Sequence, residues 1–289
     1  MLKVGFIGLG TMGFPIAGHI SESYKTSVFN RTIRKSQKWT SQFKGEICES
    51  IQNLTHKSDV ILLCLSEDKD IEEIVLGDEG VLKHLKQGTI VIDHSTTSVD
   101  TATAISNHLS KKDSFYLDAP VSGGEAGAQN GTLSVMIGGN KGAYKEISTL
   151  LDCYSSFHKY MGPSGNGQLT KMINQICITG VIKSLSEAIN FAKAQEGLDL
   201  NKVFNAISSG AAQSWQLDNR FHTMVKGEFD FGFGIDLMIK DLKIAINQAK
   251  SNDVSLETVQ SILDEYIVLS KIGGGDQDTS SLIKSLQNS

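Results

Sequence analysis

The sequence lacks the features that mark secreted, membrane-spanning and nucleic-acid-binding proteins. Its cysteines (Cys48, Cys64, Cys153 and Cys177) are scattered and form no CxxC pair, so we expect free, mostly buried thiols rather than disulfides or a metal site. The longest apolar run in the first third, VILLCL at 60–65, is far too short to cross a bilayer. Basic charge is not in excess, since the net charge is −5 and the pI is about 5.8, which argues against nucleic acid or an anionic membrane as partner.

Other signals are missing too. The seven histidines show no HxxH or HExxH spacing, so we expect no metal. The chain enters a strand at once with MLKVGFIGLG, without a basic and apolar leader, and we expect a cytoplasmic protein without a targeting segment. What remains is an ordinary globular composition: 289 residues, 40% hydrophobic and 20% charged, enough for one large or two medium domains.

The first half of the chain alternates between short apolar runs and polar helical stretches. Strands followed by helices predict a parallel sheet with helices on both faces. The expected strands are LKVGFIGLG (2–10), TSVFN (26–30), VILLCL (60–65), TIVIDHS (89–95), FYLDAP (115–120) and GTLSVMIGG (131–139).

The second half loses its strands after MGPSGNG (161–167). A stretch of nearly 30 residues without proline, 168–196, precedes Gly197 and predicts a single helix about 40 Å long. Four or five shorter helices are expected after it. The predicted fold class is therefore an α/β Rossmann-type domain at 1–163, followed by an all-helical domain at 164–289, with the long helix joining the two.

The stretch GLGTMG (8–13) is a GxGxxG that follows a strand and opens a helix. Gly8 permits a tight turn, Gly10 lets a pyrophosphate approach the backbone, and Gly13 lets helix and strand pack closely. The helix N-terminus then offers its N–H groups to the phosphates. A purely structural turn is the alternative.

The second strand ends in NRT, without the carboxylate that normally binds the adenosine ribose. Asn30 does not repel a 2′-phosphate, Arg31 offers a forked donor and Thr32 adds a hydroxyl. Arg34 and Lys35 add positive charge or form only a solvated helix face. We therefore predict NADP(H) as the preferred cofactor, with NAD(H) possible.

Two further strand ends carry polar loops. DHSTT (93–97) faces the crevice in which open sheets bind ligands, while Thr97 or Ser98 could equally cap the next helix. DAPVSGG (118–124) places two glycines after a serine, which can expose consecutive N–H groups to a carboxylate. A glycine turn without a ligand would look the same.

Two helical stretches carry lysines. In GNGQLTKMIN (165–174), Lys171 and Asn174 share one helix face, and partial desolvation would lower the pKa of the lysine toward a catalytic range. A lysine that reaches out to solvent is the alternative. In IDLMIKDL (235–242), Lys240 and Asp241 form either a buried pair or an ordinary surface pair.

Together these motifs resemble the β-hydroxyacid dehydrogenase family, typified by 3-hydroxyisobutyrate dehydrogenase, tartronate semialdehyde reductase and glyoxylate/succinic semialdehyde reductases. The resemblance covers nearly the whole chain. It rests on FIGLGTMGFPIA, DHSTTS, DAPVSGGEAGAQNGTLSVMIGG, GPSGNGQLTKMINQ, GFGIDLMIKDLKIA and GGGDQDTSSLIK. The family often has a second asparagine where this chain has Gln175, and NRT at the second strand is as in its NADP-preferring members.

The resemblance implies a Rossmann domain, a helical domain and an active site in the cleft between them. Lys171 would be the catalytic acid/base with Asn174 nearby, and Ser122, Gly123 and Gly124 would hold the substrate carboxylate. Taken with the motifs, the implied cofactor-binding residues are Gly8, Leu9, Gly10, Thr11, Met12, Gly13, Asn30, Arg31, Thr32, Leu65, Thr96 and Lys240, the last supported by Asp241.

The implied activity is that of an NAD(P)-dependent 3-hydroxyacid dehydrogenase or semialdehyde reductase acting on a small carboxylate-bearing substrate. The family usually forms homodimers or homotetramers. An imine reductase of the same fold is one alternative, but such relatives usually replace the catalytic lysine. A non-catalytic nucleotide-binding protein is the other. Residues of 209–235 are expected to line the far wall of the substrate site, including Ser214, Trp215, Asn219, Arg220 and Phe231.

Overall fold

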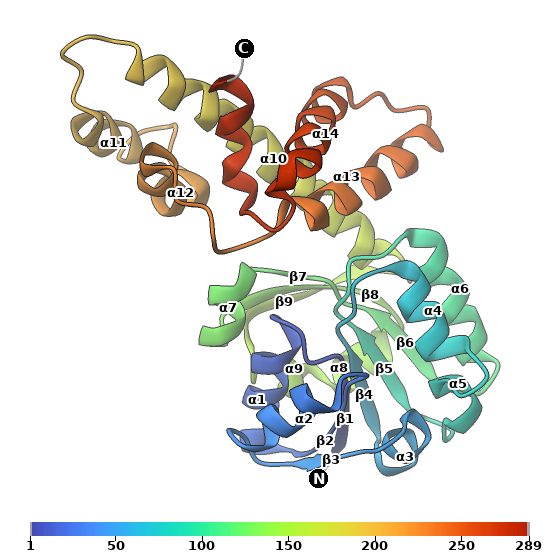
Figure 1. Ribbon diagram of the computed structural model, residues 1–289. Coiled ribbons are helices and arrows are strands. Elements are labelled where there is room, and N and C mark those ends of the chain that lie inside the picture. The colour runs from blue at the N-terminus through green and yellow to red at the C-terminus, as the bar shows by residue number, and fades with distance from the viewer. Residues whose placement is uncertain (1, 288–289) are drawn as a thin grey trace. The chain divides into compact units, whose positions relative to one another are not determined.

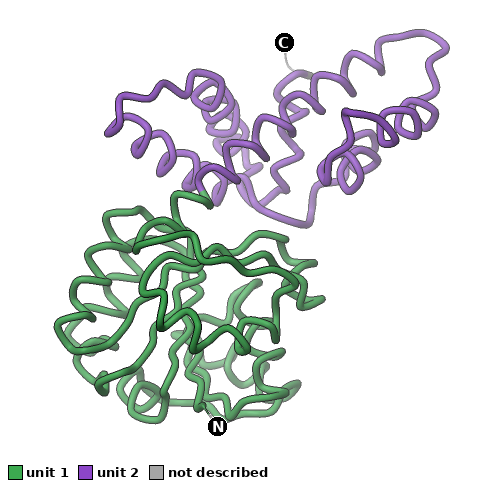
Figure 2. The backbone as a smooth tube through the Cα atoms, turned by 180° about the vertical axis from the view of Figure 1, so that it is seen from behind, with its two compact units in different colours: residues 1–171 green, residues 172–289 purple. Residues whose placement is uncertain are grey.

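The computed structural model describes residues 2–287 and divides into two compact units, Met1–Lys171 and Met172–Ser289 (Figure 2). The division falls inside the long helix α10 (Asn166–Lys193), whereas the boundary expected from the sequence, 163/164, lies just before that helix. Each unit has its own hydrophobic clusters and is described by itself.

Unit 1 is built on one sheet (Figure 1). Its strands are β1 (Lys3–Ile7), β2 (Lys25–Phe29), β3 (Glu46–Ile47), β4 (Val60–Leu63), β5 (Ile90–Asp93), β6 (Phe115–Asp118), β7 (Val121–Ser122), β8 (Leu133–Gly139) and β9 (Ser155–Gly162). The order is β3-β2-β1-β4-β5-β6-β8-β7, with β9 paired to β8. The first six strands in this order are parallel, while β8 runs antiparallel to β6 and β7.

This strand order places a topological switch point between β1 and β4, where the chain turns from one half of the sheet to the other. Open α/β sheets bind their ligands at the carboxyl ends of the strands beside such a point. The backbone confirms that these ends lie together, because Gly8 N–H donates to the Phe29 carbonyl oxygen at 3.1 Å and Cys64 N–H donates to that of Ile7 at 3.0 Å.

Helices cover both faces of the sheet, as Figure 1 shows. The helices of unit 1 are α1 (Gly13–Ser23), α2 (Ile33–Thr40), α3 (Ile51–Lys57), α4 (Asp68–Leu76), α5 (Val81–His84), α6 (Val99–Ser110), α7 (Gly124–Asn130), α8 (Lys141–Glu146) and α9 (Ser148–Leu151). Because successive strand side chains point to opposite faces, Leu62 joins the cluster with Ile16 of α1, while Ile61 joins the cluster with Ile105 of α6. The central strands are apolar throughout because both faces are buried.

Unit 2 is helical. Beside the end of α10 it contains α11 (Leu200–Ser208), α12 (Trp215–Lys226), α13 (Ile235–Lys250), α14 (Glu257–Leu269), the π-helical turn η1 (Ser270–Gly274) and the 3-10 helix η2 (Thr279–Gln287). Ile182 of α10 packs with α13 and α14, and Ile189 packs with Phe221 of α12. The long helix is thus the spine of this unit (Figure 1).

The predicted architecture of a parallel Rossmann-type sheet followed by a helical region is confirmed, and the long helix spans 166–193. The strands β3, β7 and β9 were not expected. In β9 only Ser155 is buried and polar residues separate the apolar ones, so its sequence shows no continuous apolar run.

The four cysteines are free, as expected, but the expectation that most are buried was wrong. Only Cys48 is buried, because Cys177 lies on the outer face of α10 and the other two lie at partly open positions. Within residues 2–287, no helix combines the length and apolar character needed to span a membrane. The same residues include no group of three or more histidine, cysteine or acidic side chains placed to hold a metal ion.

Candidate active site

The glycine turn after β1 has the shape that its sequence predicts. Gly8 has a φ of +99°, and a Cβ at this position would overlap the Cys64 carbonyl oxygen. A Cβ on Gly13 would overlap the Gly8 carbonyl oxygen and lie 2.9 Å from the Phe6 ring. Beside Gly10, by contrast, there is open space. Two glycines therefore let the turn close tightly, and the third leaves its outer side accessible to a ligand.

The helix that follows this turn begins without a side-chain cap. Among the described residues, α1 has no side-chain cap at its N-cap residue Met12 and no acidic residue in its first turn. The first N–H groups of a helix have no partner inside the helix and carry its positive dipole end. An uncapped helix start behind an open glycine fits the pyrophosphate of a dinucleotide.

Asn30, at the end of β2, holds the glycine turn in place. Its Oδ1 accepts a hydrogen bond from Leu9 N–H at 2.9 Å, and its Nδ2 donates to the Thr32 carbonyl oxygen at 3.1 Å. Arg31 and Thr32 are exposed. The neutral side chain thus makes a structural bond without placing negative charge beside Arg31.

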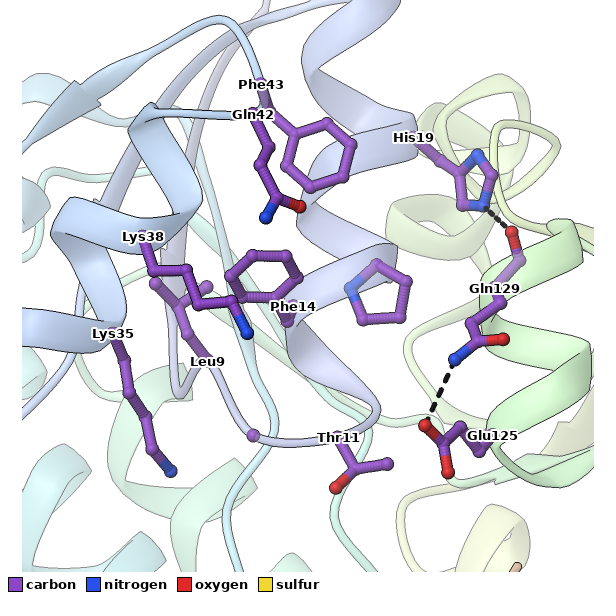
Figure 3. A pocket seen from close by; sticks show the side chains of 12 residues that line it. Leu9, Thr11, Phe14, His19, Lys35, Lys38, Gln42, Phe43, Glu125 and Gln129 are labelled. Atoms are coloured by element: carbon purple, nitrogen blue, oxygen red, sulfur yellow. Dashed lines mark hydrogen bonds between the residues drawn. The ribbon is translucent and has the colours of Figure 1, made fainter.

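A cavity of about 570 Å³ lies beside the glycine turn, lined by residues of α1, α2 and α7 (Figure 3). Lys35 and Lys38 of α2 line one side, and Lys38 Nζ lies 5.7 Å from the centre of the Phe14 ring. On the other side, Gln129 Nε2 donates to Glu125 Oε1 at 3.0 Å. Positive charge therefore borders the turn on the α2 side.

Side chains fix the loop after β5 at His94 and Ser95. His94 bridges the Ala119 carbonyl oxygen (2.6 Å) and the Tyr154 hydroxyl (2.9 Å), and Ser95 Oγ accepts from Leu65 N–H at 2.8 Å. Thr96, half-buried, comes next. Thr97 is fully buried, and its Oγ1 has no hydrogen-bond partner among the described residues.

The N-cap of α6 is Ser98, whose Oγ accepts from Thr101 N–H at 3.1 Å. Of the two capping candidates in the sequence, Ser98 is therefore the cap. Its own N–H donates to both carboxylate oxygens of Asp68 at 3.2 Å.

The glycine pair after Ser122 adopts the conformation that only glycine takes readily. Gly123 and Gly124 have φ values of +130° and +62°, and no heavy atom lies within 4 Å of a Cβ built on Gly124. Successive backbone N–H groups in such a turn form a concave donor site for anions. The turn has the positive φ values that such a site needs, and its role in binding a carboxylate stays a prediction.

Lys171 lies in the second turn of α10 and is only 8% exposed. The start of this helix is bonded to the end of β6, because Asp118 Oδ1 accepts from Gly165 N–H at 2.8 Å and Asp118 Oδ2 from Gln168 N–H at 3.0 Å. The Gln168 side chain bonds the 95–97 loop: its Nε2 donates to the Ser95 carbonyl oxygen at 2.9 Å and its Oε1 accepts from Thr97 N–H at 3.1 Å.

Buried titratable groups lie under these loops. Burial raises the pKa of Asp118 to about 6, although backbone N–H groups of the α10 start oppose the shift. Burial also raises the pKa of Asp93 to about 6, against hydrogen bonds from Ser95 and Tyr116. The pKa of His94 falls to about 4, because burial disfavours the imidazolium.

In unit 2 the structure connects three predicted site residues through one that was not predicted. Asn174 Nδ2 donates to Gln175 Oε1 at 2.9 Å, and Gln175 Nε2 donates to Asp241 Oδ2 at 2.6 Å. Lys240 Nζ lies 3.1 Å from Asp241 Oδ1, and Asp241 is 2% exposed. The Lys240–Asp241 pair is thus anchored by a buried carboxylate and is no ordinary surface pair.

Unit 1 therefore contains the glycine turn, Leu65, Thr96, the Ser122–Gly124 turn and Lys171, whereas Asn174 and Lys240 belong to unit 2. The sequence interpretation missed Gln168, the helix-start role of Asp118 and the bridging role of Gln175. One signal was available. Residues 168, 171 and 175 recur at i, i+3 and i+7, so a polar stripe runs along one face of an otherwise apolar helix.

Two family models match the chain end to end. The NAD binding domain of 6-phosphogluconate dehydrogenase matches residues 3–164, and the NAD-binding domain of NADP-dependent 3-hydroxyisobutyrate dehydrogenase matches residues 165–286. The chain belongs to the 3-hydroxyisobutyrate dehydrogenase family. The resemblance drawn from the motifs is thereby confirmed.

Named relatives agree with this assignment. An uncharacterized oxidoreductase of Shewanella frigidimarina is 43% identical over 100% of this chain and 99% of its own length. The 2-hydroxy-3-oxopropionate reductase of Escherichia coli is 31% identical, covering 99% of this chain and 97% of its own. Among solved structures, Psf3 in complex with NADP⁺ and 2-OPP has a TM-score of 0.89 at 26% identity, covering 98% of this chain and 99% of its own. The chain is an NAD(P)-dependent oxidoreductase of the hydroxyacid dehydrogenase type.

Proposed function

We propose that the protein is an NADPH-preferring enzyme that interconverts a small 3-hydroxy acid and its semialdehyde, with Lys171 as general acid/base. The observation that carries the proposal is Lys171 itself, a lysine that is only 8% exposed, in a helix whose first turn is hydrogen-bonded to the loop after β5 and to the end of β6. A surface lysine that only solvates a helix would not be enclosed in this way.

The cofactor has a plausible site in unit 1. Residues 8–13 would hold its pyrophosphate, and Thr96 and Leu65 would lie along the nicotinamide half. Lys240 stays a predicted cofactor contact. When bound, the nicotinamide supplies or accepts the hydride at the carbon that carries the oxygen.

In the reducing direction, Lys171 donates its proton to the carbonyl oxygen as negative charge develops there, so the product is an alcohol and the lysine is left neutral. In the oxidising direction the neutral amine takes the hydroxyl proton back. The N–H groups of Gly123 and Gly124, with Ser122, would hold the substrate carboxylate and align the carbonyl, while Asn174 supports the site.

The preference for NADPH rests on the end of β2. Asn30 gives the bond that the glycine turn needs without a carboxylate, and Arg31 beside it is exposed and carries a fork of donors suited to phosphate. Lys35 and Lys38 add positive charge at the neighbouring cavity. The similar structure that contains NADP⁺ supports the same choice.

The substrate class follows from the glycine turn and from the relatives. A carboxylate cradle suits a short acid, and the E. coli relative is named for the reduction of 2-hydroxy-3-oxopropionate. A panel of 2-hydroxy-3-oxopropionate, succinic semialdehyde, glyoxylate and 3-hydroxyisobutyrate, assayed with both cofactors by nicotinamide absorbance, would identify the substrate. A homodimer or homotetramer and a cytoplasmic location stay predictions.

The decisive test replaces the lysine. We expect Lys171→Ala to lower kcat for the best panel compound by ~10²-fold or more, the scale of a lost general acid, while NADPH binds within about twofold of wild type. Lys159→Ala, which changes an exposed lysine of β9 in the same unit, is the matched control. Wild-type turnover by Lys171→Ala would refute the proposed mechanism.

A further inference from the structure

Gln168 joins two segments that are far apart in the sequence. The residue is fully buried, and its side-chain amide bonds both the carbonyl oxygen of Ser95 and the N–H of Thr97. The Gln168 amide thus donates to residue 95 and accepts from residue 97, the pattern that a neighbouring β-strand would make with this loop. Thr96, between the two bonded residues, is consequently held at a set distance from the start of α10.

Asp118 holds the same helix start from the opposite side. Its two carboxylate oxygens accept from the N–H groups of Gly165 and Gln168, at 2.8 and 3.0 Å. The approach is close, because a Cβ on Gly167 would overlap the Asp118 and Met136 carbonyl oxygens. The first turn of α10 is thus fixed both to the end of β6 and, through Gln168, to the loop after β5.

Lys171 lies three residues after Gln168, one helical turn further along. Since a helix turn is rigid, any change in how Gln168 bonds the loop also moves the lysine relative to Thr96. A hydrophobic residue would fill the same buried space without requiring hydrogen-bond partners. The amide instead fixes which loop residues lie opposite the helix start, because its donor and its acceptor each need a particular backbone partner.

We propose that Gln168 is a positioning residue that sets Lys171 against the 95–97 loop, and that Asp118 provides the fixed support for it. The inference rests on the proposed function, because it acts through the acid/base role of Lys171. It goes beyond that function by naming the residue that fixes the position of Lys171 relative to the 95–97 loop.

Gln168→Ala removes both side-chain bonds. Thr170→Ala is the matched control in the same turn, because within residues 2–287 the Thr170 hydroxyl bonds only the Asn166 carbonyl oxygen of α10. We expect Gln168→Ala to lower kcat about 10- to 100-fold, the effect of misplacing a reacting group by about an ångström, with the KM for NADPH changed less than about threefold. Thr170→Ala should keep the kcat of wild type.

Hydrogen exchange gives a readout that needs no activity. In Gln168→Ala the Thr97 amide loses its acceptor, so a peptide spanning 95–98 should exchange faster than in wild type and in Thr170→Ala. This measurement shows that the bond exists in solution and that the variant is folded.

Gln168→Glu keeps the shape and tests the hydrogen-bond pattern. Ionised, it still accepts from Thr97 N–H but repels the Ser95 carbonyl oxygen; protonated, it donates to that oxygen as the amide does. The kcat of this variant, divided by that of wild type at each pH, should therefore rise as the pH falls. The division removes the part of the pH dependence that the two proteins share.

The outcomes separate the two proposals. Loss of thermal stability in Gln168→Ala with a wild-type kcat, or a flat ratio for Gln168→Glu, would overturn the positioning role and leave the proposed function standing. Wild-type turnover by Lys171→Ala would overturn both. A low kcat for Lys171→Ala and Gln168→Ala, with faster exchange at Thr97 and a pH-dependent ratio for Gln168→Glu, supports both.

Discussion

Replacing His94 by glutamine should make unit 1 less sensitive to acid. The imidazole is buried between the Ala119 carbonyl oxygen and the Tyr154 hydroxyl, at 2.6 and 2.9 Å. One ring nitrogen donates to the carbonyl and the other accepts from the hydroxyl, so the neutral ring satisfies both partners. A second proton would place a buried charge with no carboxylate bonded to it.

The size of the effect follows from the pKa of His94. Burial lowers it from 6.5 to about 4, so the unfolded chain binds the proton more tightly than the folded protein. Stability is therefore full above pH 6.5 and is lost as the pH falls toward 4. The loss from this residue is about 2 kcal/mol by pH 5 and about 3 kcal/mol in total, at 1.36 kcal/mol per pKa unit.

Asp93 and Asp118 act in the opposite direction. Burial raises the pKa of each to about 6, so their ionisation lowers stability at neutral pH, and this penalty disappears as the pH falls below 6. A stability curve of the wild type alone mixes these contributions. The difference between wild type and His94→Gln isolates the histidine.

Urea unfolding at pH 7, 6, 5 and 4, followed by tryptophan fluorescence, measures this difference. Trp39 is fully buried in unit 1, whereas Trp215 is 52% exposed in unit 2, so a Trp215→Phe background restricts the signal to unit 1. His108→Gln, which removes an exposed histidine of α6, is the control. If His94→Gln lost the same free energy of unfolding as wild type between pH 7 and pH 5, the burial argument would be refuted.

Two further predictions concern cofactor choice and the core of unit 2. Arg31→Ala should weaken the binding of NADPH at least tenfold and that of NADH little. Asn30→Asp keeps the acceptor for Leu9 N–H but adds a negative charge, so it should act in the same direction. Equal losses of affinity for both cofactors in fluorescence titrations would exclude a 2′-phosphate contact. Gln175→Leu removes the donor to the buried Asp241 carboxylate and should lower the free energy of unfolding by about 2–3 kcal/mol, whereas an unchanged urea midpoint would show that the bond contributes nothing.

Much of unit 1 was predictable because its signals are local. A glycine turn between a strand and a helix, and apolar strands separated by helices, indicate a parallel sheet with its ligand site at one edge. The strands β3, β7 and β9 were missed for a physical reason. The first two are two residues long, and β9 lies at the sheet edge, where only its first residue, Ser155, is buried.

In the candidate site, too, some residues could be predicted from local sequence and others could not. Lys171 and the Ser122–Gly124 turn stand out in the sequence because their residue types are unusual for their places. Gln168 does not, since its partners are 71 and 73 residues away and become neighbours only when β5 and β6 pair. The i, i+3, i+7 spacing of polar residues shows that a helix face is special, but it does not say what that face contacts.

Three backbone N–H groups in the loops around the site are bonded by neutral side chains. Asn30 fixes Leu9, Ser95 fixes Leu65 and Gln168 fixes Thr97, each through a backbone N–H. The buried carboxylates take other donors: Asp93 accepts from Ser95 N–H and the Tyr116 hydroxyl, and Asp118 accepts from N–H groups at the start of α10. A carboxylate used for any of the three loop bonds would oppose a bound phosphate or substrate carboxylate. At these three bonds a neutral side chain therefore holds the backbone without adding negative charge where we propose that an anionic cofactor and an anionic substrate bind.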